Sequence, residues 1–225
     1  MKHTLFFKIY LIVSCIYLLI LLSGNESLDL YLKPVLIPLL GFAVYAYKRF
    51  PSRNTLLAAL AFSWIGDVIL LFADIAEIYF ILGLVSFLIS HIMYCTLFNK
   101  QEHIQTRNNI VFRIGCGIIA VYLIGMLWVL LPTLGDLKIP VIVYAFVICT
   151  MVLFAFNGFL TWSKPGNKYA FAGAVIFVLS DSILAMDKFH APIEKSAFMI
   201  MLTYLLAQYL LVDGILKLNP KKTDR

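Results

Sequence analysis

Residues 54–98 read NTLLAALAFSWIGDVILLFADIAEIYFILGLVSFLISHIMYCTLF. Two apolar runs, 54–73 and 77–98, are separated by only three residues. Each run is close to the ~20 residues that a helix needs to cross the hydrocarbon core of a bilayer. Backbone groups in lipid must form hydrogen bonds within their own segment, which favours a helix over irregular chain. This stretch therefore predicts two membrane-spanning helices joined by a tight connection.

The same alternation of apolar runs and short polar breaks continues through all 225 residues. Hydrophobic residues make up 62% of the chain and charged residues 13%, against about 25% charged residues in soluble domains. The mean hydropathy is +0.94. This composition excludes a soluble enzyme, a disordered chain and a nucleic-acid-binding module. We expect an all-α, polytopic membrane protein that forms a single domain over residues 1–225, with eight spans at 4–22, 30–47, 54–73, 77–98, 109–131, 138–160, 167–186 and 196–216.

The distribution of basic residues predicts the orientation of these spans. The net charge of +6 is spread unevenly, because 14 of the 18 Lys and Arg residues fall on one side if both termini are cytoplasmic. The four basic residues on the other side are Lys33, Lys138, Lys188 and Lys195. Cytoplasmic loops of membrane proteins carry an excess of Lys and Arg. The sequence therefore predicts eight transmembrane helices with both termini in the cytoplasm.

Ionisable side chains interrupt several of the predicted spans. Asp67, His91 and Asp181 lie inside apolar runs, and Lys33 lies near the outer end of span 30–47. A charged residue at the membrane centre costs about 2.5–3.5 kcal/mol on insertion scales, so such residues commonly mark functional sites. Packing does not require the two aspartates, because apolar side chains fill the same space at lower cost. We therefore predict that Asp67 and Asp181 carry the function.

Several polar side chains are predicted to lie at similar depth. At 1.5 Å per residue, Asp67 lies about 9 Å below the outer end of its span, and Asp181 lies slightly less deep. Three side chains from other spans share this outer layer: Lys33, Tyr144 and Tyr204. Three more lie deeper in the membrane: His91, Tyr94 and Gln208. Because residues four apart share one helix face, we expect these side chains to turn toward one cavity that holds both aspartates.

A small residue precedes each aspartate, in Gly66-Asp67-Val68-Ile69-Leu70 and in Ser180-Asp181-Ser182-Ile183-Leu184. Small residues let a neighbouring helix approach closely. The similarity of the two stretches also indicates an internal repeat of four helices plus four, as some transporters have.

Each polar side chain also has a purely structural interpretation. Tyr144 and Tyr204 would form hydrogen bonds between helices, and His91 would be a hydrogen-bonded core residue. The Lys33 ammonium group would reach the lipid headgroups or pair with an aspartate. A structural role is predicted for Asp213, because Lys217 lies four residues later at the end of the last span, where an i,i+4 ion pair can form.

The order of these motifs resembles the YhhN-like family of membrane proteins, which includes the lysoplasmalogenases. The motifs that carry the resemblance are Lys33-Pro34, Gly66-Asp67, Gly83 with His91 and Tyr94, Ser180-Asp181, and Tyr204 with Gln208. The resemblance implies hydrolysis of the vinyl-ether bond of a lysoplasmalogen, which gives a fatty aldehyde and glycerophosphoethanolamine or glycerophosphocholine. The implied partners are a lysophospholipid substrate and membrane lipids, and no nucleic acid.

The candidate residues fit this implied chemistry. Vinyl-ether hydrolysis needs a general acid that protonates carbon, a negative group beside the oxocarbenium ion, and a water molecule. An apolar environment favours the protonated form of a carboxyl group, and a second carboxylate stabilises the cation, as in glycosidases. We expect Asp67 and Asp181 to divide these roles, in an order that the sequence leaves open, and His91 to orient a carboxylate. The expected substrate-binding residues are Lys33, Tyr94, Tyr144, Ser180, Tyr204 and Gln208.

Two other classes of function stay open at this stage. A proton-coupled transporter is compatible with intramembrane aspartates and an internal repeat, and a lysolipid-binding protein would hold the lipid without turnover. A metal-dependent hydrolase is less compatible, because His91 is the single histidine deep in a span and zinc hydrolases commonly use two or three. We therefore expect no metal or other cofactor. The compact chain fits a bacterial plasma membrane, with a eukaryotic endomembrane as the alternative, and the sequence predicts no oligomeric state.

Overall fold

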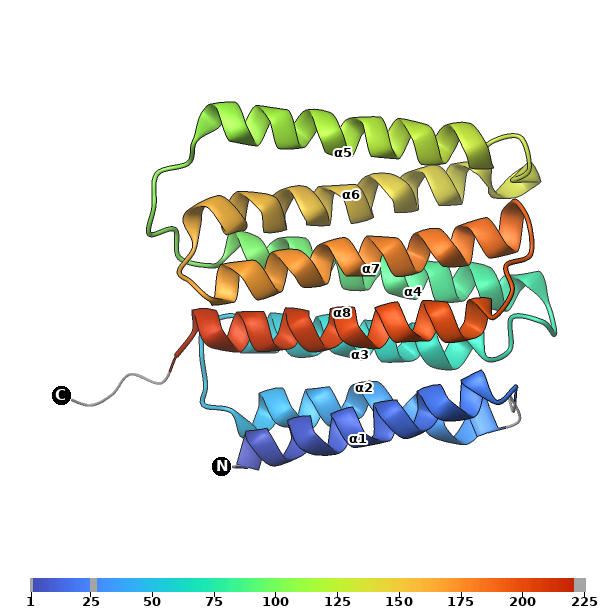
Figure 1. Cartoon of the computed structure of the whole chain (residues 1–225), viewed down its shortest axis with the longest axis horizontal. Coiled ribbons are helices and arrows are strands. Elements are labelled where there is room, and N and C mark those ends of the chain that lie inside the picture. Colours follow the sequence, from blue (N-terminus) through green and yellow to red (C-terminus); the bar gives the residue numbers. More distant parts are fainter. Residues whose placement is uncertain (1, 25–27, 221–225) are drawn as a thin grey trace.

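Eight α-helices make up the computed structural model of the protein, which describes residues 2–24 and 28–220 (Figure 1). They are α1 (Lys2–Leu22), α2 (Asp29–Ala46), α3 (Arg53–Leu70), α4 (Glu77–Asn99), α5 (Asn109–Leu130), α6 (Lys138–Thr161), α7 (Gly166–Phe189) and α8 (Ser196–Leu218). A short 3-10 helix, η2 (Gly135–Leu137), precedes α6. No strand occurs in these residues, and all eight helices are long and apolar enough to cross a membrane. The predicted all-α fold with eight spans is confirmed.

The helices run side by side in alternating directions (Figure 1). The central helices are α3, α4, α7 and α8, with α1 and α2 on one flank and α5 and α6 on the other. The start of α1 and the end of α8 lie at the same end of the bundle, which we call the terminal end. The α3–α4 and α7–α8 connections lie at the opposite end. Which end faces the cytoplasm stays a prediction, and three basic residues used for it, at positions 221, 222 and 225, lie outside the described residues.

Small residues hold α7 and α8 in close contact. A methyl group at Gly214 would lie 2.6 Å from the backbone nitrogen of Ala170, and one at Gly173 would lie 2.8 Å from that of Leu211. Both distances are shorter than any side chain tolerates, so glycine is required at these crossings. Membrane helices associate through such contacts because lipid provides no hydrophobic driving force between them. The close packing fixes α7, which carries Asp181, against α8, which carries Tyr204.

A hydrogen bond from α3 replaces a backbone hydrogen bond that is missing in α2. Pro38 lies inside α2 and has no N–H group, so the carbonyl of Pro34 lacks its helical donor. The indole nitrogen of Trp64 on α3 donates to this carbonyl at 2.8 Å. An unsatisfied backbone carbonyl is costly in lipid, so this bond stabilises α2 and joins it to the helix that carries Asp67.

Two helix ends differ from the sequence prediction by three residues. The α3 helix ends at Leu70 instead of residue 73, because the amides of Phe72 and Ala73 bond three residues back and tighten the chain into turns. Asp67 is therefore three residues from the end of its helix, or about 4.5 Å. The α7 helix continues to Phe189 instead of residue 186, since hydropathy falls at Asp187 and Lys188 while the helical backbone continues.

Two predictions about helix faces are confirmed. His91 and Tyr94, which the sequence predicts to turn inward, are buried on α4 together with Gly83 and Phe87. Lys217 Nζ lies 2.6 Å from Asp213 Oδ2, as expected for the structural i,i+4 pair. The repeat of four helices plus four stays a prediction.

Candidate functional site

Both intramembrane aspartates line one cavity of about 280 Å³. The cavity lies in the half of the bundle opposite the terminal end, where Asp67 comes from α3 and Asp181 from α7. Four more residues singled out by the sequence line it as well: Lys33, Tyr144, Ser180 and Tyr204. We call it the acidic cavity. Side chains from distant parts of the chain thus meet in one cavity.

Asp67 is held in place by a tyrosine and by the close approach of α4. Its side chain is buried, and the Tyr204 hydroxyl donates a hydrogen bond to its Oδ2 at 2.6 Å. The preceding residue, Gly66, leaves room for the Phe87 ring, whose carbons lie 2.7 Å from where a Cβ atom would be. Glycine at this position therefore lets α4 pack beside the carboxyl group, as the sequence motif predicts.

Asp181 has a corresponding arrangement on α7. The Tyr144 hydroxyl donates a hydrogen bond to its Oδ2. The preceding residue, Ser180, donates to the Ile200 carbonyl at 3.0 Å and so ties α7 to α8 beside the carboxyl group. Because its hydroxyl donates to this backbone carbonyl, Ser180 has a positioning contact in addition to its place on the cavity wall.

His91 lies behind Asp181. Its Nε2 is 3.9 Å from Asp181 Oδ2, and its side chain has no exposed surface. Neither ring nitrogen has a hydrogen-bond partner among the described residues. Buried polar atoms are nearly always hydrogen-bonded, so an unpaired imidazole next to an intramembrane carboxyl group is an unusual feature of this site.

An aromatic cluster connects the two aspartate–tyrosine pairs. The Phe177 ring packs edge-on against His91 with ring centroids 4.8 Å apart, and against Tyr204 with centroids 5.5 Å apart. The His91 ring also packs edge-on against Tyr144, at 5.3 Å. Edge-to-face packing restricts ring orientation. The cluster therefore restricts the orientation of both tyrosine rings.

Two predicted substrate-binding residues do not reach the cavity. Tyr94 donates a hydrogen bond to Gln208 Oε1 at 2.7 Å, and neither side chain is exposed. The Gln208 amide donates to Ser63 at 2.9 Å and to the Tyr204 hydroxyl at 3.4 Å. The prediction that Tyr94 and Gln208 contact the substrate is therefore wrong for this cavity. Both side chains lie deeper in the bundle, toward the terminal end. Their hydrogen bonds instead hold the Tyr204 hydroxyl in place from the side of the terminal end.

Some residues of the site were not singled out by the sequence. Ser63 lies one helical turn before Asp67 on the same face of α3, a spacing that could have identified it. The rim of the cavity carries further charged side chains: Asp29, Asp74, Asp187 and Lys188. These residues lie at helix ends and in a connection, where charged residues are common, so the sequence gives no reason to select them. The packing of the helix ends brings them together.

The rim carries cations beside carboxylates, two of which accept hydrogen bonds. Asp29 accepts a hydrogen bond from Tyr17 at 2.8 Å, and Asp187 accepts one from the Ile193 amide at 2.7 Å. Lys33 lines the cavity without a direct ion pair in residues 2–24 and 28–220, and Lys188 Nζ lies 5.3 Å from the centre of the Phe80 ring. The opening thus places two ammonium groups, those of Lys33 and Lys188, among three carboxylates. No group of three His, Cys, Asp or Glu side chains among these residues is placed to hold a metal ion.

The chain is similar in sequence to known proteins over most of its length. Human lysoplasmalogenase TMEM86A is 30% identical over 172 residues, which cover 71% of this chain and 64% of that protein. Bovine lysoplasmalogenase TMEM86A is 28% identical over 173 residues, covering 72% and 65%. Human lysoplasmalogenase TMEM86B is 28% identical over 217 residues, covering 95% and 88%. The chain therefore spans slightly less than two thirds of the length of the TMEM86A proteins.

The sequence model of the YhhN family matches residues 28–215, from the start of α2 to the last turn of α8. No solved structure matches the chain significantly. The matched region contains every residue that lines the acidic cavity. Because the match covers most of the chain and its whole candidate site, this protein belongs to the YhhN family.

Proposed function

We propose that this protein is an intramembrane hydrolase that cleaves the vinyl-ether bond of lysoplasmalogens. The products would be a fatty aldehyde and glycerophosphoethanolamine or glycerophosphocholine. One observation carries the proposal: the buried Asp67 and the half-buried Asp181, from different helices, line one cavity, each with a tyrosine hydroxyl donating to it. The names of the TMEM86 relatives support the same reaction class.

The surroundings of the two carboxyl groups differ, which supports different roles. Asp181 and Tyr144 also line a second, almost wholly apolar cavity between α5, α6 and α7. Asp67 lines only the acidic cavity, whose rim carries Lys33. In a lysoplasmalogen the vinyl-ether bond lies where the polar glycerol joins the hydrocarbon tail. A substrate with its headgroup near Lys33 and its tail in the apolar cavity would place this bond beside Asp181.

In the proposed reaction, the Asp181 carboxyl group donates its proton to the vinyl carbon that is farther from the ether oxygen. The double-bond electrons form the new C–H bond, which leaves an oxocarbenium ion. Asp67, as the carboxylate, stabilises this cation and takes a proton from the water that attacks it. As the hemiacetal breaks its C–O bond, Asp67 gives its proton to the glycerol oxygen and Asp181 takes the proton of the hemiacetal hydroxyl. Aldehyde and alcohol are released, and both carboxyl groups return to their starting states. Overall one water is consumed and no redox partner is needed.

The remaining residues have supporting roles in this proposal. The hydroxyls of Tyr204 and Tyr144 keep the two carboxyl groups in place and are near enough to the cavity to bond glycerol oxygens. His91 is a positioning residue behind Asp181, and Lys33 attracts the substrate phosphate as a point charge. Such preorganised polar groups contribute much of the rate acceleration in water-excluded sites.

The test is aldehyde release from a synthetic lysoplasmalogen by purified protein in detergent or liposomes. Asp67→Asn and Asp181→Asn each keep the side-chain shape and remove the acid, and general acid–base catalysis contributes about 10²–10⁴-fold to rate. We expect losses of that order in both variants. Asp213→Asn is the matched control, because Asp213 is also an acid in a spanning helix but pairs with Lys217 near the terminal end. Full activity in both cavity variants would refute the two-carboxylate mechanism.

The same preparation separates the other two classes of function. A lysolipid-binding protein would bind the substrate at Lys33 and the acidic cavity but release no aldehyde. A proton-coupled transporter would move a solute into proteoliposomes under a pH gradient, again without aldehyde. Either result, obtained with correctly folded wild-type protein, would replace the hydrolase proposal.

A further inference from the structure

The acidic cavity adjoins an apolar cavity on the α5 side of the bundle, which in turn adjoins a second apolar cavity. The first, of about 70 Å³, shares five lining residues with it: Phe80, Leu84, Tyr144, Asp181 and Leu184. The second, of about 590 Å³, shares four with the first: Tyr122, Cys149, Val178 and Ser182. Shared walls make the three spaces consecutive. We call the two apolar cavities together the side channel.

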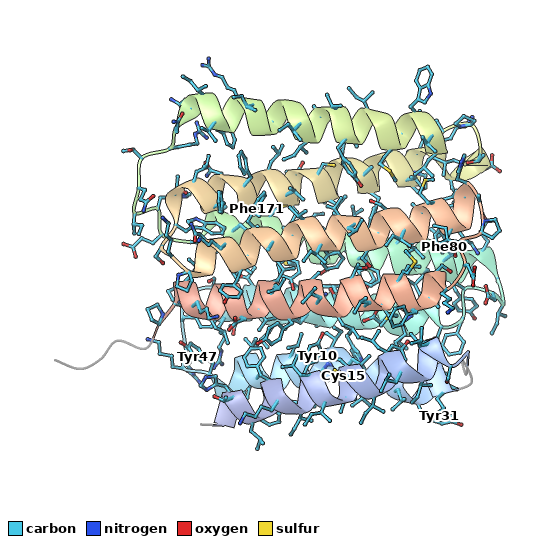
Figure 2. The ribbon with its side chains drawn as sticks, in the orientation of Figure 1. Tyr10, Cys15, Tyr31, Tyr47, Phe80 and Phe171 are labelled. Carbon is cyan, nitrogen blue, oxygen red and sulfur yellow. The ribbon has the colours of Figure 1, made fainter. Side chains whose placement is uncertain are left out.

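The side channel leads from the aspartates toward the terminal end. Figure 2 labels Phe80, which lines its first part, and Phe171, which lines its last part, and the two lie toward different ends of the bundle. Along α7 the distance from Asp181 to Phe171 is ten residues, or about 15 Å. The walls are apolar apart from a few hydroxyls and the Asp181 carboxyl group at its start.

One wall of the side channel is a helix at the edge of the bundle. In α5 only Gly115 and Leu130 are buried, so most of its surface faces outward to the surrounding lipid. Gly115 lines the second cavity, where a methyl group in its place would lie 2.1 Å from the Phe156 ring. The side channel therefore runs just beneath the lipid-facing surface, between α5 and the core helices.

A hydrogen bond between α5 and α7 lies where the two parts of the side channel meet, so a tail that reaches the second part has to pass beside it. The hydroxyls of Tyr122 on α5 and Ser182 on α7 are bonded to each other, and Ser182 also donates to the Val178 carbonyl at 2.5 Å. Ser182 directly follows Asp181 in sequence. The crossing therefore joins the peripheral helix to the segment that carries the catalytic candidate.

We propose that the side channel holds the hydrocarbon tail of the substrate, with the vinyl-ether bond at Asp181 and the end of the tail between α5 and α7. This inference rests on the proposed function and assigns the tail-length preference to the residues of the second cavity. A flexible aliphatic chain is the occupant because the walls are apolar, the space is elongated, and it begins at the carboxyl group that would attack the head–tail junction. Lipid on the far side of α5 gives the tail an entry path between helices.

The kinetic test uses a substitution that narrows the second cavity of the side channel. Val175 lines only the second cavity and is 44% exposed, and Val143 on α6 lines neither cavity and is 45% exposed, so Val175→Trp and Val143→Trp are a matched pair. Turnover is compared for hexadecenyl and octenyl lysoplasmalogens. We expect Val175→Trp to lower kcat/KM for the hexadecenyl substrate by about tenfold or more, because several methylene groups lose their apolar contacts. The octenyl substrate and the Val143→Trp variant should be unaffected.

A binding test keeps the tail site separate from the reaction. The probe is a lysophospholipid with a saturated ether-linked tail that carries a diazirine near its end, which cannot be hydrolysed by the proposed route. After illumination we expect labelled peptides from α5 and α7, removed by excess unlabelled lipid and by Val175→Trp but retained in Val143→Trp. Such labelling without any aldehyde release from lysoplasmalogen would refute the hydrolase while keeping the tail site. Labelling confined to α1, α2 or α3, or equal losses for both tail lengths, would overturn the tail site.

Discussion

Replacing Tyr204 by phenylalanine removes one oxygen atom from beside Asp67. The ring keeps its packing against Phe87 and Phe177, with centroids at 5.8 and 5.5 Å. What is lost is the 2.6 Å hydrogen bond to the Asp67 carboxylate and the weaker 3.4 Å contact from Gln208, whose amide keeps its bond to Ser63 at 2.9 Å. The change therefore isolates the contribution of one hydroxyl to the site.

The two consequences of Tyr204→Phe differ in size. A hydrogen bond to a charged group contributes about 1.5–3 kcal/mol, so if Tyr204 holds the catalytic carboxylate, kcat should fall about 10- to 160-fold at 1.36 kcal/mol per decade. Hydrogen bonds between membrane helices contribute only about 0.6 kcal/mol to stability on average. We therefore expect a large loss of aldehyde release with a small change in Tm.

The assay measures kcat, KM and Tm of the purified variant in the same detergent. Tyr79→Phe is the control, because Tyr79 lies at the same end of the bundle, is partly exposed and does not line the acidic cavity. Wild-type kcat in Tyr204→Phe would refute the role of this hydroxyl. A loss of activity that matches the loss of folded protein would show a structural role instead.

Three further changes test other parts of the site. Lys33→Met should raise KM for a lysoplasmalogen several-fold with kcat unchanged, and should leave a phosphate-free alkenylglycerol unaffected; equal effects on both would contradict a phosphate contact. His91→Phe should lower kcat with KM unchanged while Tm is kept or raised, because it removes two buried nitrogens without partners; an unchanged kcat would rule out positioning of Asp181. Gly214→Leu should lower the stability of the bundle by about 1–3 kcal/mol through overpacking, because its Cβ would lie 2.6 Å from the Ala170 nitrogen. Gly117→Leu is the control, because a Cβ atom there meets nothing within 4 Å. A thermal unfolding assay should show a loss for Gly214→Leu and no change for Gly117→Leu.

The sequence alone determined the membrane architecture and the identity of the two acids. A span must match the thickness of the bilayer and be apolar, so length and hydropathy are sufficient to locate all eight helices. A carboxyl group inside such a span is costly, so Asp67 and Asp181 stand out without any knowledge of packing. The same reasoning singled out His91, whose side chain is buried in α4.

The tertiary structure decided which side chains share the site and which lie behind it. Helices that are apolar on all sides give no periodic signal for their partners, so hydropathy does not reveal that Tyr204 bonds Asp67 while Tyr144 bonds Asp181. Depth counting also could not separate the cavity wall from the layer below it, where Tyr94 and Gln208 bond each other. Close contacts between particular small residues, such as Gly214 against Ala170, set the crossings of these helices, and those crossings place the two carboxyl groups in one cavity.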